Sequence, residues 1–337
     1  MRFLFRLTAV FFVSLAILFS GLRLFSDFKA AEAERDYPPQ GAFVQAENLR
    51  IHYVRKGTGR PVILIHGSFG SVNDFTFSIF QKASASYDVT AFDRPGHGYS
   101  QRPSEGMTIF DHARILHEAV NALGIQRPVV TGHSLGGAVA LAYALDYPED
   151  VSALVLLAGY VTPYEGPPRI IHRAPAWPVI GKIYLNTLVE PIGIYLQGQI
   201  AKRVFSSGSL PLDYLETAAA LARRPSHFRA NAEDIRNLPA GLESARARLS
   251  ELKMPVLYLA GDADQIAPKE RHADSFKTLV PASEIIVIPG GGHQPSFTAP
   301  DKVMEVLDLA WRRSDEAAVI PLAPSANPPE STESPER

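Results

Sequence analysis

The chain of 337 residues contains no cysteine, which removes several kinds of chemistry at once. Disulfides, thiolate metal sites and a cysteine nucleophile are all excluded. The cellular compartment stays open, because a chain with 46% hydrophobic residues can bury a large core without covalent cross-links.

The chain also has little excess charge of either sign: 33 Lys and Arg stand against 35 Asp and Glu, a formal net charge of -2. No broad positive field attracts nucleic acid, so we expect no nucleic-acid partner. The sequence has no internal repeat, no phosphate-cradling glycine loop and no His-rich metal spacing. We therefore expect neither a cofactor nor a metal, so any catalysis would rely on amino-acid side chains alone.

The most informative segment is Gly132-His133-Ser134-Leu135-Gly136, which lies between the largely apolar runs 129–131 and 138–141. This order predicts a strand, a sharp turn and a helix, with a serine hydroxyl at the turn. The pattern Gly-x-Ser-x-Gly recurs by chance, so the rest of the chain has to support it. Ser134 is the candidate nucleophile.

A candidate acid and a candidate base follow Ser134 in the chain order that this kind of site uses. Asp264 follows the apolar strand expected at 256–261, and His293 follows the strand expected at 284–288. Both come just after the carboxyl end of a strand, where residues distant in sequence converge in open α/β sheets. An imidazole can accept the serine proton, and a buried carboxylate orients the imidazole.

With these motifs the chain resembles the α/β-hydrolase fold superfamily, in the branch of esterases, C–C bond hydrolases and cofactor-free haloperoxidases. The resemblance covers roughly residues 42–312. It rests on ordered motifs: His66-Gly67, Asp93-Arg94-Pro95-Gly96-His97-Gly98-Tyr99-Ser100, the turn at Ser134, Gly261-x-x-Asp264-x-x-x-Pro268 and Gly292-His293. It implies a mostly parallel eight-stranded sheet with helices on both faces and a helical cap inserted after strand 6.

The resemblance also assigns roles to five residues. Ser134 is implied as the nucleophile, His293 as the base and Asp264 as the orienting acid. The backbone N–H groups of Ser68 and Leu135 are implied as the oxyanion hole. Relatives that remove halides or open epoxides carry aspartate at the nucleophile position, so a serine there argues against both chemistries.

Two other carboxylates compete with Asp264 for the role of the acid. Asp262 lies two residues away, and Glu165 follows the sixth strand, where some relatives keep their carboxylate. We favour Asp264 because its offset from Gly261 and Pro268 matches the family pattern.

These residues predict a serine hydrolase that cleaves a carboxylic ester, or a related acyl bond, of a small and largely apolar substrate through an acyl-enzyme on Ser134. Perhydrolysis of the haloperoxidase type and C–C bond hydrolysis on the same triad stay open. A different class of protein is also possible: a non-catalytic, membrane-tethered ligand-binding protein that keeps the fold. The sequence leaves the substrate's identity and the oligomeric state open.

The first 26 residues predict a transmembrane anchor or a signal segment. Arg2 and Arg6 precede the uncharged run 7–22, and a helix over 7–25 would span about 28 Å, close to the roughly 30 Å of hydrocarbon. The nearest small-residue cleavage site, at 31–33, is late and charged, which favours an uncleaved anchor. Positive charge at the N-terminus favours that end inside the cell, with the catalytic domain outside the cytoplasm. Cleavage would instead leave a secreted or periplasmic protein.

The remaining chain divides by composition and periodicity. The long interval between the sixth and seventh strands predicts the helical cap, with helices near 184–196 and 210–221. Arginines there, at positions 169, 173, 203, 223 and 224, predict a solvated helix face or, less favoured, a clamp for a carboxylate. The expected parts are a linker at 27–41, the hydrolase core at 42–160 and 251–313, the cap at 161–250 and a disordered tail at 314–337.

Overall fold

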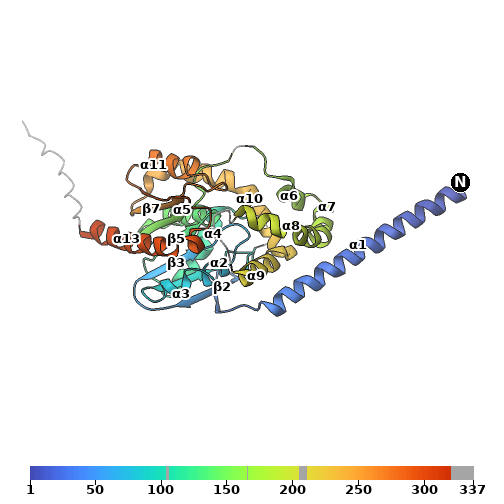
Figure 1. Cartoon of the computed structure of the whole chain (residues 1–337), viewed down its shortest axis with the longest axis horizontal. Coiled ribbons are helices and arrows are strands. Elements are labelled where there is room, and N and C mark those ends of the chain that lie inside the picture. Colours follow the sequence, from blue (N-terminus) through green and yellow to red (C-terminus); the bar gives the residue numbers. More distant parts are fainter. Residues whose placement is uncertain (104–105, 165, 205–210, 320–337) are drawn as a thin grey trace, which may run out of the picture.

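The computed structural model describes residues 1–103, 106–164, 166–204 and 211–319. A body of mixed helices and strands carries the long N-terminal helix α1 (Arg2–Asp36), which projects away from it (Figure 1). Among the described residues, α1 is the one helix long and apolar enough to cross a membrane by length and composition.

One sheet of eight strands forms the centre of the body, in the order β1-β2-β4-β3-β5-β6-β7-β8. The first two strands run antiparallel to their neighbours, and the strands from β3 onward run parallel to one another. This confirms the predicted α/β-hydrolase fold. The strands are β1 (Ala42–Ala46), β2 (Leu49–Lys56), β3 (Pro61–Ile65), β4 (Asp88–Phe92), β5 (Val129–His133), β6 (Ala153–Leu157), β7 (Val256–Gly261) and β8 (Glu284–Ile288).

Helices cover both faces of the sheet, as the continuous apolar sequences of its central strands require. One buried cluster packs α4 and α5 against the sheet, and a second cluster packs α2, α3 and α13 against the other face. The body helices are α2 (Asn73–Thr76), α3 (Phe80–Ala83), α4 (Ile109–Ala122), α5 (Leu135–Asp146), α11 (Ser275–Leu279), α12 (Pro295–Thr298) and α13 (Pro300–Val319).

The segment between β6 and β7 is a helical insertion, as predicted. Its elements are α6 (Ile170–Arg173), α7 (Ile180–Ile183), the π-helical turn η3 (Tyr184–Leu188), α8 (Val189–Val204), α9 (Leu212–Arg223) and α10 (Pro225–Arg246). The two predicted helices correspond to η3 with α8 and to α9, although Leu210 lies outside the described residues.

The sequence did not predict α10, a helix of 22 residues. It is polar overall and contains Pro239, which lacks an N–H and ordinarily breaks a helix. The carbonyl that loses its partner, that of Ile235, instead accepts a hydrogen bond from the Tyr164 hydroxyl at 2.7 Å. A side chain from outside the helix thus compensates for the proline.

Two predicted segments are partly helical in the structure. The linker predicted at 27–41 is helical as far as Asp36, because residues 27–36 hold no Gly or Pro and the Ser26 and Ala33 face of α1 is buried against the body. Of the disordered tail predicted at 314–337, residues 314–319 are the last residues of α13, and the remaining residues lie outside the part of the chain that the structure describes. An ion pair between Arg313 and Glu284 holds that part of α13 on the sheet.

Candidate active site

Ser134 lies at a strained turn between β5 and α5. Its backbone has φ 55 and ψ -120, a conformation that costs energy for a residue with a side chain. The neighbouring glycines allow the turn: a Cβ on Gly132 would lie 2.1 Å from the Gly136 carbonyl oxygen, and one on Gly136 would lie 2.2 Å from that of Ile65. The strand and the helix therefore approach closely and present the serine at the carboxyl edge of the sheet.

Three predicted residues meet at this edge. His293 Nε2 lies 2.9 Å from Ser134 Oγ, and His293 Nδ1 lies 2.8 Å from Asp264 Oδ2. All three residues are at most 6% exposed. The arrangement connects a hydroxyl, an imidazole and a carboxylate in one chain of hydrogen bonds, although the residues lie far apart in sequence.

Asp264 is held by its own loop as well as by His293. Its Oδ1 accepts backbone N–H bonds from Ile266 at 2.7 Å and Ala267 at 2.9 Å. Burial alone would raise the pKa of Asp264, but the hydrogen bond and charge of His293, with these N–H donors, lower it overall. The carboxylate is therefore ionised at neutral pH and can orient the imidazole.

Of the two alternative acids, Asp262 does not take this position. Asp262 Oδ1 instead accepts the backbone N–H of Gly290 at 2.6 Å, which fixes the loop leading to His293. Glu165 lies outside the described residues.

The predicted oxyanion donors belong to two segments that adjoin Ser134. Leu135 is the first residue of α5, and the first N–H groups of a helix have no intrahelical acceptor. Ser68 follows Gly67 in the turn after β3, and a Cβ on Gly67 would lie 2.9 Å from Ser134 Cβ. The turn and the nucleophile are thus in contact.

The sequence did not predict that Arg94 holds this turn in place. Its Nε donates to the His66 carbonyl at 3.0 Å, and its Nη2 donates to the Gly67 carbonyl at 3.1 Å. His66 Nε2 accepts the backbone N–H of Arg94 at 2.9 Å. Burial and the Arg94 charge lower the pKa of His66 well below its usual range, so a neutral His66 acts as a brace.

Arg94 also forms an ion pair with the insertion. Its Nη1 lies 2.5 Å from Oδ2 of Asp234, a residue of α10. Arg102 and His112 contact the other carboxylate oxygen at 2.7 Å and 3.0 Å. Through the buried Asp234 carboxylate, α10 of the insertion is therefore bonded to Arg94, Arg102 and His112 of the body.

Tyr160 is a second residue of the site that the sequence did not predict. Its backbone N–H donates to the Ser134 carbonyl at 2.9 Å. Burial and the Asp264 charge raise the pKa of Tyr160 to about 12, against the effect of a hydrogen bond with the Ser134 side chain. Its position in the sequence could have indicated this role, because Tyr160 closely follows the carboxyl end of β6, and β6 is the neighbour of β5 in the sheet.

Aromatic side chains of the insertion cover the turn beside Ser134. The Phe69 ring lies 5.5 Å from that of Phe228 and 6.1 Å from that of His172. Phe228 in turn lies 6.1 Å from Tyr184 of η3. Half-buried aromatic rings of the insertion therefore pack on the turn beside Ser134 and give it apolar surface, which suits an apolar substrate.

The predicted cap arginines have separate environments. Arg223 forms an ion pair with Glu190 at 3.0 Å, whereas Arg224 is buried and bonds Glu34 of α1 at 2.9 Å. The predicted solvated face is therefore wrong for Arg224. Arg169 and Arg173 are exposed, and the side chain of Arg203 lies outside the described residues.

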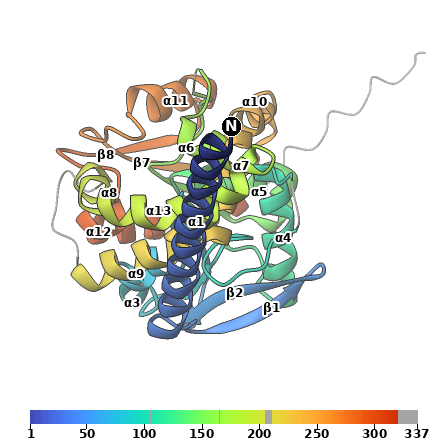
Figure 2. The ribbon, with the colours of Figure 1, turned by 90° about the vertical axis from the view of Figure 1, so that its right-hand side faces the viewer.

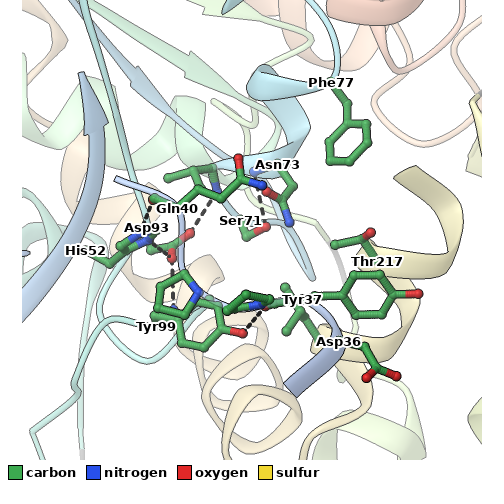
Figure 3. Close-up of a pocket in the computed structure, with 15 residues that line it drawn as sticks. Asp36, Tyr37, Gln40, His52, Ser71, Asn73, Phe77, Asp93, Tyr99 and Thr217 are labelled. Atoms are coloured by element: carbon green, nitrogen blue, oxygen red, sulfur yellow. Dashed lines mark hydrogen bonds and ion pairs between the residues drawn. The ribbon is translucent and has the colours of Figure 1, made fainter. Parts of the chain in front are cut away.

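A separate cavity of about 100 Å³ lies at the foot of α1 (Figure 3). Its lining includes Tyr37, His52, Asp93 and Tyr99, and contains none of Ser134, Asp264 and His293. His52 Nδ1 lies 2.6 Å from Asp93 Oδ2, and the Tyr99 hydroxyl donates to the Tyr37 carbonyl. The residues that line this cavity therefore connect the C-terminal end of α1 to the body.

No group of three or more His, Cys, Asp or Glu side chains suited to a metal ion occurs among the residues that the structure describes.

Residues 60–300 match the alpha/beta hydrolase fold family, and the chain belongs to that family. A 2-hydroxy-6-oxononadienedioate/2-hydroxy-6-oxononatrienedioate hydrolase of Paraburkholderia phymatum is 30% identical over 77% of this chain and 90% of its own length. A thermophilic esterase from Thermogutta terrifontis is similar in structure, with a TM-score of 0.65 and 22% identity over 82% of this chain and 99% of that one. A membrane phospholipase A has a TM-score of 0.63 and 20% identity over 95% and 99% of the two chains. The family and these relatives support a hydrolase.

Proposed function

We propose that this protein is a serine hydrolase that cleaves a carboxylic ester of a small, largely apolar acyl substrate. The observation that carries the proposal is the hydrogen-bonded series from Ser134 through His293 to Asp264, at 2.9 Å and 2.8 Å. A serine hydroxyl becomes nucleophilic when an oriented imidazole can take its proton.

In the proposed reaction, His293 Nε2 accepts the Ser134 proton as Oγ attacks the carbonyl carbon. The oxyanion of the tetrahedral intermediate is bound by the backbone N–H groups of Ser68 and Leu135. The intermediate collapses as His293 protonates the departing alcohol, leaving an acyl group on Ser134. Water then attacks this ester with His293 again as the base, which releases the acid and restores the serine.

The same residues suit two related reactions. A C–C bond hydrolase is among the relatives, at 30% identity, and a putative non-heme chloroperoxidase of Synechocystis is 27% identical over 77% of this chain. Ester hydrolysis is preferred because the aromatic rings of Phe69 and Phe228 pack together beside the Ser134 turn and offer apolar surface to an acyl group. A ligand-binding protein without activity would not need the strained turn at Ser134.

The proposed location is a membrane, with α1 as an uncleaved anchor and the hydrolase domain outside the cytoplasm. Support comes from the length and hydropathy of α1, with Arg2 and Arg6 at its start. The membrane phospholipase A aligns with 95% of this chain, a share that includes part of α1. Alkaline extraction of membranes from expressing cells tests the anchor: release of full-length protein into the soluble fraction would exclude it.

A series of p-nitrophenyl esters of increasing acyl length, hydrolysed by the full chain in detergent, tests the activity. The Ser134→Ala variant should lose about 10⁴ to 10⁶-fold in turnover with its fold intact. The matched Ser68→Ala variant should keep most of its turnover, because only the backbone N–H of that residue is used. Near-normal rates in Ser134→Ala would remove this serine from the mechanism.

A further inference from the structure

Exposed apolar side chains concentrate in one part of the insertion. Beyond residue 36, fifteen large hydrophobic residues of the described chain are exposed, and nine of them lie within residues 169–195, here named the cap tip. Scattered exposed apolar residues are ordinary, but a concentration of them marks an interaction surface. The nine residues are Ile170, Ile171, Trp177, Val179, Ile180, Ile183, Ile192, Ile194 and Tyr195.

The cap tip lies beside α1. The helix packs on η3, α8 and α9, and its buried face includes Ser26 and Ala33. Figures 1 and 2 show that α1 leaves the body at the end where α6, α7 and α8 lie, and that these three helices are next to α1. Ser26 directly follows the apolar run of α1, so the cap tip meets α1 where the helix would leave a bilayer.

The contacts at the foot of α1 fix this arrangement. Glu34 of α1 pairs with the buried Arg224 at 2.9 Å, and Arg224 also donates to the Gly98 carbonyl of the body. The Tyr99 hydroxyl bonds the backbone at Tyr37, directly after the helix. A bilayer that contains α1 is therefore held at a set position relative to the cap tip.

The charges of the cap tip fit an anionic bilayer surface. Its basic residues, Arg169, Arg173 and Lys182, are all exposed. Its one acidic residue, Glu190, is buried and paired with Arg223 at 3.0 Å. Basic side chains beside apolar ones are typical of surfaces that lie at the headgroup level of anionic membranes.

The most prominent side chains of the cap tip also suit the interface. Val179 is 72% exposed and has φ 61, an unusual conformation for a β-branched residue, at a turn that presents it outward. Trp177 and Tyr195 are exposed aromatics, the type enriched where a membrane meets water.

We propose that the cap tip inserts its apolar side chains into the same anionic phospholipid bilayer that α1 spans. This inference rests on the membrane anchor proposed above. The aromatic series from Tyr184 through Phe228 to Phe69 leads from the cap tip to the turn beside Ser134. An acyl ester dissolved in the bilayer would then lie next to the insertion that packs on the Ser134 turn.

The two tryptophans of the chain allow a direct test. The Trp311→Phe variant keeps Trp177 in the cap tip as the single fluorophore, and the Trp177→Phe variant keeps Trp311. Trp311 belongs to α13, a helix that Figure 1 shows away from α6 and α7, and the Arg60 guanidinium lies 5.0 Å from the centre of its ring. The full chain is reconstituted in phosphatidylcholine and phosphatidylglycerol vesicles containing lipids brominated at shallow or deep acyl positions.

The proposal predicts that shallow bromines quench Trp177 by at least twofold and leave Trp311 nearly unchanged. Val179→Asp with Ile180→Asp, placed in the Trp311→Phe protein, should reduce this quenching by half or more. The matched control Leu279→Asp changes another exposed apolar residue, on α11 away from the cap tip, and should leave quenching unchanged.

Equal and weak quenching of Trp177 and Trp311 would overturn the proposal. A blue-shifted Trp177 emission without bromine quenching would also overturn it, and would identify a second copy of the chain as the cover. Co-flotation of each variant with the vesicles reports whether α1 is inserted, and fluorophosphonate labelling of Ser134 reports the proposed activity. A failed anchor or activity is therefore distinguished from a cap tip that stays in water.

Discussion

The Arg94 guanidinium joins the turn beside Ser134 to the helical insertion through Asp234, with Arg94 Nη1 2.5 Å from Asp234 Oδ2. Both side chains are at most 1% exposed. Because Arg94 also donates to the His66 and Gly67 carbonyls, the position of the oxyanion turn depends on a carboxylate 140 residues away.

Replacing Asp234 should therefore destabilise the protein strongly. The Asp234→Asn variant leaves Arg94 buried without its counter-charge, which we expect to cost about 3–5 kcal/mol of unfolding free energy. Asp146→Asn is the matched control, because its pair with Arg248 is partly exposed and should contribute below about 1 kcal/mol. Urea unfolding in detergent measures both, and equal losses would contradict the proposed importance of the buried pair.

The contribution of Asp234 should also depend on pH in a defined direction. Burial alone would raise the pKa of Asp234, but His112 and the Arg94 guanidinium lower it well below its usual range. A carboxylate whose pKa is lower in the folded than in the unfolded state stabilises the fold at pH values above its unfolded pKa. This stabilisation is lost as the pH falls through the folded pKa. The difference in unfolding free energy between wild type and Asp234→Asn should stay constant from about pH 5 to 8 and shrink below about pH 4. A difference that grows on acidification would refute this sign.

The two neighbouring aspartates should have different effects on catalysis. Asp264→Asn removes the carboxylate that contacts His293 and should lower turnover by about 10⁴-fold. Asp262→Asn only alters an acceptor for the Gly290 N–H and should lower turnover by less than about tenfold. Steady-state ester hydrolysis compares them, and a larger loss in Asp262→Asn would reverse the assignment of the acid.

The glycine after the nucleophile turn should tolerate no side chain. A Cβ at Gly136 would lie 2.2 Å from the Ile65 carbonyl oxygen and 2.4 Å from that of His66, and neither backbone atom can move freely. Gly136→Ala should therefore lower stability by more than about 2 kcal/mol or displace the Ser134 turn, with loss of activity. Gly198→Ala is the control, since nothing lies within 4 Å of a Cβ there and alanine favours a helix. Similar melting temperatures and activities for the two variants would contradict this account.

Much of the fold and the meeting of three site residues could be predicted because their signals are local. Ser134, Asp264 and His293 each lie in a short glycine-containing motif just after a strand, and parallel strands bring their carboxyl ends to one edge. The strand predicted at 284–288 coincides with β8, because its apolar run is also a local signal.

The missed residues depend on contacts between distant segments. Asp234 lies on α10, whose prolines and polar sequence concealed the helix, so its pairing with Arg94 had no local signal. Tyr160 needed knowledge that β5 and β6 are neighbours. The extension of α1 to Asp36 depends on packing against the body, which includes the pairing of Glu34 with Arg224.

The most direct test of the central claim is mass-spectrometric mapping of the full chain after reaction with a fluorophosphonate. We expect a single adduct on Ser134, lost in Ser134→Ala and formed much more slowly in His293→Ala, because that variant lacks the imidazole that activates the hydroxyl. A folded wild-type protein that stays unlabelled, or that carries its adduct on another serine, would contradict the account.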